Sequence, residues 1–282
     1  MYKILKKEKL TSRIVRMIIE APKVAAKSLP GQFIILRVDE TGERIPLTIA
    51  GYDREEGTVT IIFDPVGKTT QLLSELNEGD SISDFVGPLG TASDINDYKK
   101  VAIIGGGLGC AIAYPQAKAI YENKAKVDII AGFKSKEFVI LEDEMKAVSD
   151  RFFLMTDDGS AGEEGLVTKK LEELLEKGER YDAVIAIGPL VMMKFVSLLT
   201  KKYDTKTIVS MNPIMIDGTG MCGGCRLTVG NEVKFACVDG PDFDGHQVDF
   251  DEAIRRSRVY ADQEQIAREG HVCRMEGMSD DK

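Results

Sequence analysis

One aspartate and three cysteines near the C-terminal end of the chain have the types and spacing of metal ligands. Asp217, Cys222, Cys225 and Cys237 follow one another as D-x4-C-x2-C-x11-C in this 282-residue chain. Thiolate sulfur binds both iron and zinc, and a carboxylate oxygen can supply a fourth ligand. The glycines between these residues let the backbone wrap tightly, so that amide N–H groups can point at the sulfurs. The four side chains therefore form a candidate metal site.

The spacing favours a two-iron, two-sulfur (2Fe-2S) cluster. Plant-type sites of this kind use C-x4-C-x2-C and a distant fourth cysteine, and here Asp217 takes the place of the first cysteine. A structural zinc site with the same four ligands is one alternative, although zinc more often binds paired C-x2-C motifs or histidines. A glycine-rich loop with buried thiols and no metal is the other. The remaining cysteines, Cys110 and Cys273, are expected to be packed or surface thiols.

A second candidate site is the run Gly105-Gly106-Gly107-Leu108-Gly109, which follows the apolar run Val101–Ile104. Where a strand turns into a helix in this way, free amide groups and the positive helix end can bind a phosphate. The G-x-G-x-x-G motif is incomplete, because Cys110 stands where its third glycine would fall. The alternative is a turn that only lets the strand and the helix pack closely. The run predicts a nucleotide-binding loop.

Three shorter segments carry further groups that can hold phosphates. Arg44-Ile45-Pro46-Leu47-Thr48 places a cation and a hydroxyl about one strand apart. Gly67-Lys68-Thr69-Thr70 opens a short helix, so its amides and hydroxyls can hold a pyrophosphate. Gly188-Pro189-Leu190 follows a strand, at the sheet edge where ligands bind in such folds. Each segment alone is more often a turn or a solvated strand, and it is their joint occurrence that favours a binding site.

The elements around these motifs predict an antiparallel β-barrel followed by an α/β unit. Short runs rich in branched residues, separated by turns, predict the barrel over residues 1–97. Its expected strands are Ser12–Ile19, Gln32–Val38, Pro46–Ala50, Val59–Phe63 and Ser81–Val86, with a short helix near Thr69–Leu76. Alternating strands and helices over residues 98–211 predict a parallel, Rossmann-like sheet. Its expected strands are Val101–Ile104, Val127–Ala131, Phe152–Met155, Ala183–Ile187 and Thr207–Met211, and its expected helices are a stretch to about Asn123, Leu141–Val148, Leu166–Glu176 and Leu190–Leu199.

The C-terminal part is expected to form two further regions. Residues 212–248, rich in Gly and Cys, predict a small iron–sulfur domain. Residues 249–282 predict an amphipathic helix, Phe250–Ala267, and a polar tail. The helix carries Arg255, Arg256 and Arg258 in an otherwise acidic protein. They are either a docking surface for an acidic or carbonyl-rich partner or a solvated helix face.

Composition and charge exclude several classes of function. The chain has 37 Lys+Arg and 46 Asp+Glu, a formal net charge of −9, and no basic block, so neither nucleic acid nor an anionic membrane is an expected partner. No apolar run approaches the ~20 residues of a bilayer span, and the N-terminus lacks the apolar core of a signal peptide. Five cysteines, an odd number, argue against a disulfide framework. A cytoplasmic location is therefore expected.

Together these features resemble the ferredoxin–NADP reductase superfamily. Within it, the chain is similar to the electron-transfer subunits of dihydroorotate dehydrogenase and to the small subunits of NADH-dependent reduced ferredoxin:NADP oxidoreductases. The second resemblance is the closer one, because dihydroorotate dehydrogenase subunits have a cysteine at the position of Asp217. Thr156-Asp157-Asp158-Gly159-Ser160 and Gly270-His271-Val272-Cys273-Arg274 also look like that family.

The resemblance implies three cofactors, FAD, a 2Fe-2S cluster and NAD(H), and residues that hold each. It assigns Arg44, Pro46, Leu47, Thr48, Gly67, Thr69 and Thr70 to FAD, Gly106, Gly107, Gly109, Asp157 and Gly188 to NAD(H), and Asp217, Cys222, Cys225 and Cys237 to the cluster. Leu47 and Thr48 match the last two positions of the family's R-x-Y-[ST] segment. Ile45 stands at its Arg position, so Arg44, one residue earlier, would reach the pyrophosphate instead.

The activity that the resemblance implies is hydride transfer between nicotinamide and flavin, followed by single electrons passing to the cluster. As the family works, the partner is a large subunit that carries a second FAD and 4Fe-4S clusters and is similar to the small subunit of glutamate synthase. Electrons from NADPH would then be split between ferredoxin and NAD. No catalytic side chain is required, and His246 and His271 are expected to be surface or packing residues.

Two points stay open at the level of sequence. Lys134 and Lys136 can meet a 2′-phosphate, so the residues do not decide between NAD and NADP. Two other functions are also compatible with the motifs. One is the electron-transfer subunit of an NAD-dependent dihydroorotate dehydrogenase, and the other is a non-enzymatic, zinc-stabilised nucleotide-binding module.

Overall fold

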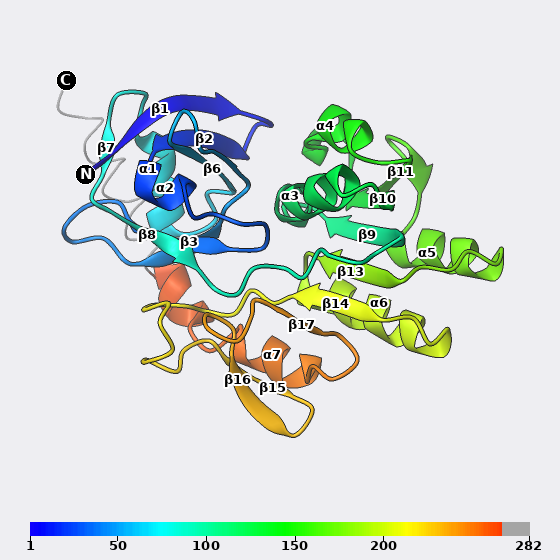
Figure 1. Ribbon diagram of the computed structural model, residues 1–282. Coiled ribbons are helices and arrows are strands. Elements are labelled where there is room, and N and C mark those ends of the chain that lie inside the picture. Colours follow the sequence, from blue (N-terminus) through cyan, green and yellow to red (C-terminus); the bar gives the residue numbers. More distant parts are fainter. Residues whose placement is uncertain (267–282) are drawn as a thin grey trace.

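The first third of the chain folds into two antiparallel sheets, ordered β5-β6-β2-β1-β7 and β4-β3-β8 (Figure 1). The structure is a computed structural model, and it describes residues 1–266. The strands are β1 (Tyr2–Lys9), β2 (Val15–Glu20), β3 (Phe33–Arg37), β4 (Ile45–Thr48), β5 (Gly51–Asp53), β6 (Thr58–Phe63), β7 (Ser81–Ile82) and β8 (Asp84–Leu89). Two short helices, α1 (Pro22–Ala25) and α2 (Lys68–Glu75), accompany them. This is the antiparallel, barrel-like unit that the branched runs predict.

Alternation of side chains builds the core of this unit. In β2, Val15, Met17 and Ile19 are buried, and the residues between them are more exposed. Ile61 and Phe63 of β6 pack in the same apolar cluster. Because the side-chain period of a strand is two residues, this pattern fixes which face of each sheet points inward.

The middle of the chain forms one sheet ordered β12-β11-β10-β9-β13-β14-β17, in which every pair is parallel except β14 with β17. Its strands are β9 (Lys100–Gly106), β10 (Lys126–Phe133), β11 (Arg151–Thr156), β12 (Glu163–Glu164), β13 (Ala183–Ile187), β14 (Thr207–Ser210) and β17 (Asp242–Asp244). The central strands are apolar on both faces, as a sheet covered on both sides requires. The predicted parallel sheet is confirmed.

Helices cover both faces of this sheet (Figure 1). The helices α3 (Gly109–Glu122) and α4 (Glu142–Ala147) share one apolar cluster with the sheet, and α5 (Val167–Glu176) and α6 (Leu190–Lys202) share the other. A short 3-10 turn, η1 (Lys136–Phe138), follows β10. Side chains of the barrel join both clusters, so the barrel packs directly on the α/β unit.

The C-terminal part consists of a hairpin, β15 (Arg226–Val229) and β16 (Glu232–Phe235), then β17 and the helix α7 (Phe250–Arg256). The predicted helix Phe250–Ala267 is wrong in its length. The structure has a turn over residues 257–260 and resumes a helix at 261–266, whereas Ala267 lies outside the described residues. The Ser257 hydroxyl donates to the Ile254 carbonyl at 3.0 Å, which is the local side-chain bonding that competes with helix continuation.

The predicted domain boundaries at 97/98, 211/212 and 248/249 stay predictions. The strand β17, from the predicted iron–sulfur region, extends the sheet of the α/β unit. Within residues 1–266, no helix is long and apolar enough to cross a membrane.

Candidate functional site

The strand order of the parallel sheet brings two glycine segments together. The chain moves outward from β9 through β10 and β11 to β12, then returns to β13 on the other side of β9. The last residue of β13, Ile187, lies opposite Gly105 of β9. In open α/β sheets, ligands bind at the carboxyl ends of the strands where the order reverses. The loops after β9 and β13 meet at this position.

A cleft of about 470 Å³ lies between this position and the barrel. Seven residues that the sequence assigns to cofactors line it, namely Pro46, Leu47, Thr48, Gly106, Gly107, Gly109 and Gly188. Its volume falls within the range of roughly 300–1,000 Å³ that small-molecule sites occupy. The structure therefore brings one expected flavin segment and both expected nucleotide loops into a single cleft.

Backbone geometry explains two glycines of the loop after β9. Gly107 has φ +54°, a left-handed conformation that side chains other than glycine rarely adopt. A Cβ atom on Gly109 would lie 2.3 Å from the carbonyl oxygen of Ile187, so α3 can begin this close to β13 only with a hydrogen there. No side chain caps the start of α3 at Leu108. The amides of Cys110 and Ala111 donate to the carbonyls of Gly107 and Leu108 at 3.1 and 3.0 Å, so among the described residues the amides of Leu108 and Gly109 are the ones left for a ligand.

The other residues assigned to FAD do not line the cleft. Arg44 precedes β4, and its Nε donates to the Ile216 carbonyl at 3.1 Å. The Thr69 hydroxyl donates to the Glu43 carboxylate at 2.8 Å, and the Thr70 hydroxyl donates to a carbonyl of its own turn, at Gly67. These groups bond to protein atoms in this structure, so their roles toward FAD stay predictions.

Asp157 lies at the carboxyl end of β11 and is exposed outside the cleft. The loops after β10 and β11 are joined at Ser160, whose Oγ accepts from the Lys136 amide at 2.7 Å and donates to Asp158 at 2.6 Å. Lys134 and Lys136 are exposed on the same edge. Both signs of charge are present there, so these loops by themselves favour neither NAD nor NADP.

Several lining residues of the cleft were not singled out from the sequence. They are Phe33, Ile62, Ile112, Ile187, Ser210, Met211, Asn212, Pro213, Met215 and Pro241. Ser210 ends β14, at the same sheet edge as Gly188, so the rule that identifies Gly188 also applies to the residues that follow β14. Phe33 and Ile62 carry no comparable signal, because they are ordinary apolar residues of barrel strands.

The cysteine loop, defined here as residues 216–225, lies directly on the barrel. A Cβ atom on Gly218, where φ is +82°, would lie 2.8 Å from Cδ1 of Leu89 and 2.9 Å from Cγ1 of Ile35. Cys222 is exposed, whereas Cys225 and Cys237 are buried. The loop therefore presents one sulfur outward and keeps another against the core.

Backbone amides point at the sulfurs. Gly224 N–H donates to Sγ of Cys222 and Cys237 N–H donates to Sγ of Cys225, each at 3.4 Å. The pKa of Cys222 is lowered, mainly by the Gly224 amide and next by the Asp217 amide. Burial, the largest cause, raises the pKa of Cys237 to about 12, so that thiol needs a cation to become a thiolate.

The Asp217 carboxylate bonds within its own loop. It accepts from the Thr219 hydroxyl at 2.6 Å and from the Met221 amide at 3.1 Å, and the hydrogen bond from Thr219 is the main cause of its lowered pKa. Among residues 1–266, no three His, Cys, Asp or Glu side chains gather as a metal site. The chemistry of the donors fits an iron–sulfur cluster, because they are thiols and a carboxylate, and backbone amides are aimed at the sulfurs of Cys222 and Cys225. The assignment of the four ligands stays a prediction.

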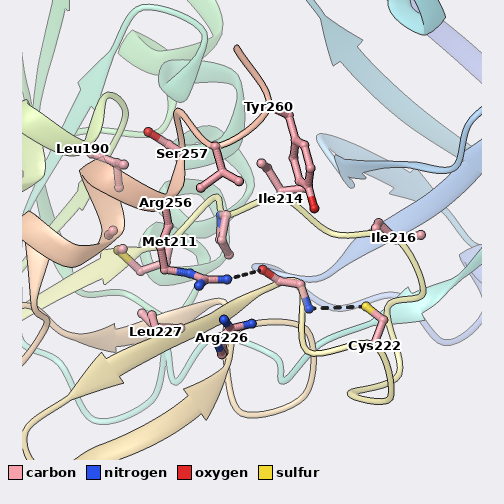
Figure 2. Close-up of a pocket in the computed structure, with 14 residues that line it drawn as sticks. Leu190, Met211, Ile214, Ile216, Cys222, Arg226, Leu227, Arg256, Ser257 and Tyr260 are labelled. Atoms are coloured by element: carbon pink, nitrogen blue, oxygen red, sulfur yellow. Dashed lines mark hydrogen bonds between the residues drawn. The ribbon is translucent and has the colours of Figure 1, made fainter. Parts of the chain in front are cut away.

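A second cavity, of about 250 Å³, lies beside Cys222 (Figure 2). Figure 2 shows Arg256 and Cys222 approaching the same backbone segment, where Arg256 Nη2 donates to the Gly224 carbonyl at 3.2 Å. Met211 lines both this cavity and the cleft. The apolar segment over residues 211–216 therefore forms a wall between the cleft and the cysteine loop.

The remaining candidate residues lie away from both cavities or outside the described chain. Cys110 is fully buried, and burial raises its pKa to about 12, as for a packed thiol. His246 Nε2 lies 3.1 Å from the Thr200 hydroxyl. The segment Gly270-His271-Val272-Cys273-Arg274 lies outside the described residues. Arg255 and Arg258 are exposed.

Comparison with known proteins relates this geometry to a family. Residues 212–249 match the iron–sulfur cluster binding domain of dihydroorotate dehydrogenase B. An uncharacterized protein of the adh 3′ region of Clostridium beijerinckii is 52% identical over 272 residues, covering 94% of this chain and 92% of that protein. The dihydroorotate dehydrogenase B (NAD(+)) electron transfer subunit homolog of Thermotoga maritima is 46% identical over 266 residues, covering 94% of each chain.

A solved structure covers almost the whole fold. It is a chain of the NADH-dependent reduced ferredoxin-NADP oxidoreductase, determined for insights into flavin-based electron bifurcation. The two chains are 44% identical with a TM-score of 0.91, and the match covers 96% of this chain and 98% of that one. These matches support the expected cofactors, FAD, a 2Fe-2S cluster and NAD(H). The chain belongs to the family of dihydroorotate dehydrogenase B electron-transfer subunits and their homologues, which are subunits of flavin-dependent oxidoreductases.

Proposed function

We propose that the chain is the small subunit of an electron-bifurcating, NADH-dependent ferredoxin:NADP oxidoreductase. It moves hydride between NAD(H) and FAD and passes single electrons through its 2Fe-2S cluster to a large subunit. The observation that carries this proposal is the single cleft lined by Pro46–Thr48, the loop after β9 and Gly188. The wall over residues 211–216 lies between that cleft and the cysteine loop.

The residues of the chain bind, orient and exclude water. β4 would hold the flavin, the loops after β9 and β13 would hold the nicotinamide nucleotide, and the cysteine loop would hold the cluster. A bound flavin supplies the conversion between two-electron and one-electron transfer. Met215 and Pro213 line the cleft on the side of the cysteine loop. Their apolar side chains would exclude water from that side of the cleft.

Resemblance to one solved structure supports this assignment over the alternative. The chain is 44% identical to a chain of the NADH-dependent reduced ferredoxin-NADP oxidoreductase over nearly its full length. Asp217 supports the same choice through the resemblance drawn from the sequence, which implies a cysteine at that position in dihydroorotate dehydrogenase subunits. The large subunit with a second FAD and 4Fe-4S clusters, and ferredoxin as its electron acceptor, belong to this proposal.

The electron-transfer subunit of an NAD-dependent dihydroorotate dehydrogenase is the second candidate. It is favoured by the 46% identity to the Thermotoga maritima homolog of such a subunit. Capture of the native partner from source cells separates the two candidates. A glutamate-synthase-like flavoprotein with iron–sulfur clusters supports the first, and a dihydroorotate-oxidising barrel supports the second.

Cofactor content tests the proposal itself. The chain is purified anaerobically, and FAD, iron, sulfide and zinc are measured per chain, followed by reduction with NADH or NADPH. We expect one FAD, two iron atoms and two sulfides per chain, and faster flavin bleaching by NADH. A colourless chain with one zinc atom would support the zinc-stabilised module instead.

A further inference from the structure

We propose that Arg44 and Arg226 are positioning residues that raise the reduction potential of the cluster by binding two peptide units of the cysteine loop. The inference rests on the proposed function, because it concerns the 2Fe-2S cluster that the cysteine loop would hold. The two arginines come from different parts of the fold, one preceding β4 of the barrel and the other beginning β15.

The first of these peptides joins Gly223 to Gly224. Arg226 Nη1 donates to the Gly223 carbonyl at 3.1 Å, and the N–H of the same peptide, that of Gly224, donates to Sγ of Cys222 at 3.4 Å. In a planar trans peptide the C=O and N–H groups point in opposite directions. A guanidinium on the oxygen therefore fixes the orientation of the amide and polarises it toward the sulfur.

The second peptide joins Ile216 to Asp217. Arg44 Nε donates to the Ile216 carbonyl at 3.1 Å, and the N–H of the same peptide belongs to Asp217, the expected fourth ligand of the cluster. Arg44 lies two residues before Pro46, which lines the cleft. The barrel segment assigned to the flavin is thus tied to the loop assigned to the cluster.

Both arrangements place a guanidinium on a peptide of the cysteine loop, and the one at Gly223 reaches the sulfur of Cys222 through the Gly224 amide. Reduction adds one electron to a cluster that already carries negative charge, so hydrogen bonds to its sulfurs stabilise the reduced form. A cation on the far side of the Gly223–Gly224 peptide strengthens this effect, and the guanidinium of Arg44 adds positive charge beside the same loop. Loss of either guanidinium should therefore shift the potential in the negative direction.

Potentials of matched variants test the inference. In the full chain with its cluster, the midpoint potential is measured by EPR-monitored titration for Arg44→Met, Arg226→Met and the control Arg258→Met. We expect each of the first two to lower the equilibrium constant for reduction about tenfold, or about 59 mV for one electron. Arg258 is exposed and, in residues 1–266, its side chain makes no hydrogen bond to the cysteine loop. The midpoint potential of its variant should therefore shift far less. Equal potentials in all three variants and the native chain would overturn the inference.

An amide measurement tests the same geometry without the cluster. In ¹H–¹⁵N spectra of the full chain without metal, Arg226→Met should move the Gly224 amide resonance and Arg44→Met the Asp217 resonance. Amides that do not respond would contradict this mechanism. A chain that never binds iron would instead contradict the proposed function. Failure of the inference and failure of the proposed function can therefore be distinguished.

Discussion

Single atoms determine the geometry of the cleft at Gly109. The start of α3 lies so close to the carbonyl oxygen of Ile187 that only a hydrogen fits at Cα of Gly109. This close contact also holds the loop after β9 beside Gly188. Sequence predicts this loop because glycines follow an apolar strand. It does not predict the contact, which depends on β13 returning to lie beside β9.

We expect Gly109→Ala to weaken nucleotide binding about tenfold and to destabilise the chain by about 1–3 kcal/mol. The added Cβ atom would lie 2.3 Å from Ile187 O, so either α3 or β13 must move. Isothermal titration with NADH and urea unfolding measure the two effects. Gly51→Ala is the control, because its Cβ atom would have its nearest neighbour at 3.5 Å. Equal losses in both variants would contradict the assigned role.

The local sequence pattern predicts strands and helices well where the segments are apolar and regular. The strand Ala183–Ile187 has the predicted bounds, and α5 differs from its prediction by one residue. The hairpin β15–β16 and the strand β17 were missed, because they are short and lie in a segment whose composition indicates only glycine and cysteine. The site residues were likewise predicted only in part. Pro46–Thr48 and the glycine loops line one cleft, whereas Thr69 and Asp157 lie outside it.

Charge pairing fixes the far ends of the central strands. Asp128 of β10, whose side chain is 2% exposed, accepts from Arg151 of β11 at 2.8 Å and from the Tyr181 hydroxyl at 2.8 Å. Arg151 also pairs with Glu179 at 2.7 Å, and its pKa is raised mainly by the hydrogen bond to Asp128. This network lies at the amino ends of the strands, away from the cleft, and so serves stability.

Asp128→Asn should destabilise the chain by about 1–3 kcal/mol, because the buried side chain loses its charge-assisted hydrogen bonds with Arg151, which keeps Glu179 as its second partner. Chemical unfolding measures the change. Glu142→Gln is the control, since it breaks an exposed pair with Lys146 within α4 that contributes less than about 1 kcal/mol. The cleft should keep its affinity for NADH in both variants. A similar loss of stability in the control would show that the network is not special.

The three parts of the molecule meet at Asp242 of β17. Its carboxylate accepts from Ser93, in the segment that leaves the barrel, and from Gln116 of α3 at 3.3 Å. Ser210 of β14, which lies opposite Asp242 in the sheet, also acts to lower its pKa, and no charged group contributes to the shift. The other oxygen, Oδ1, is buried and has no hydrogen-bond partner in the described part of the chain. Burial, the largest cause, therefore raises the pKa of Asp242 above its usual value.

This raised pKa predicts how stability depends on pH. The folded chain keeps the Asp242 proton where the unfolded chain, with a pKa of about 3.9, has lost it. The contribution is thus fully present below that value and is lost as pH rises, by about 1.4 kcal/mol per unit, until the folded pKa is passed. Asp242→Asn should flatten the pH profile of unfolding free energy above about pH 4, whereas Asp94→Asn, an exposed change in the Ser93 segment, should not. Parallel profiles for native chain and Asp242→Asn would contradict the assignment.

The antiparallel strand β17 has a consequence for self-association. It pairs along β14 and so covers the open edge of the large sheet, while the opposite edge ends in β12, which is only Glu163 and Glu164. An uncovered edge is a template on which a second chain can add its own strand, and short, charged edges resist this. A chain that ends before residue 212 would expose β14, and light scattering should then detect its aggregation. The segment that carries the cysteines thereby also covers the edge at which copies of the chain could pair.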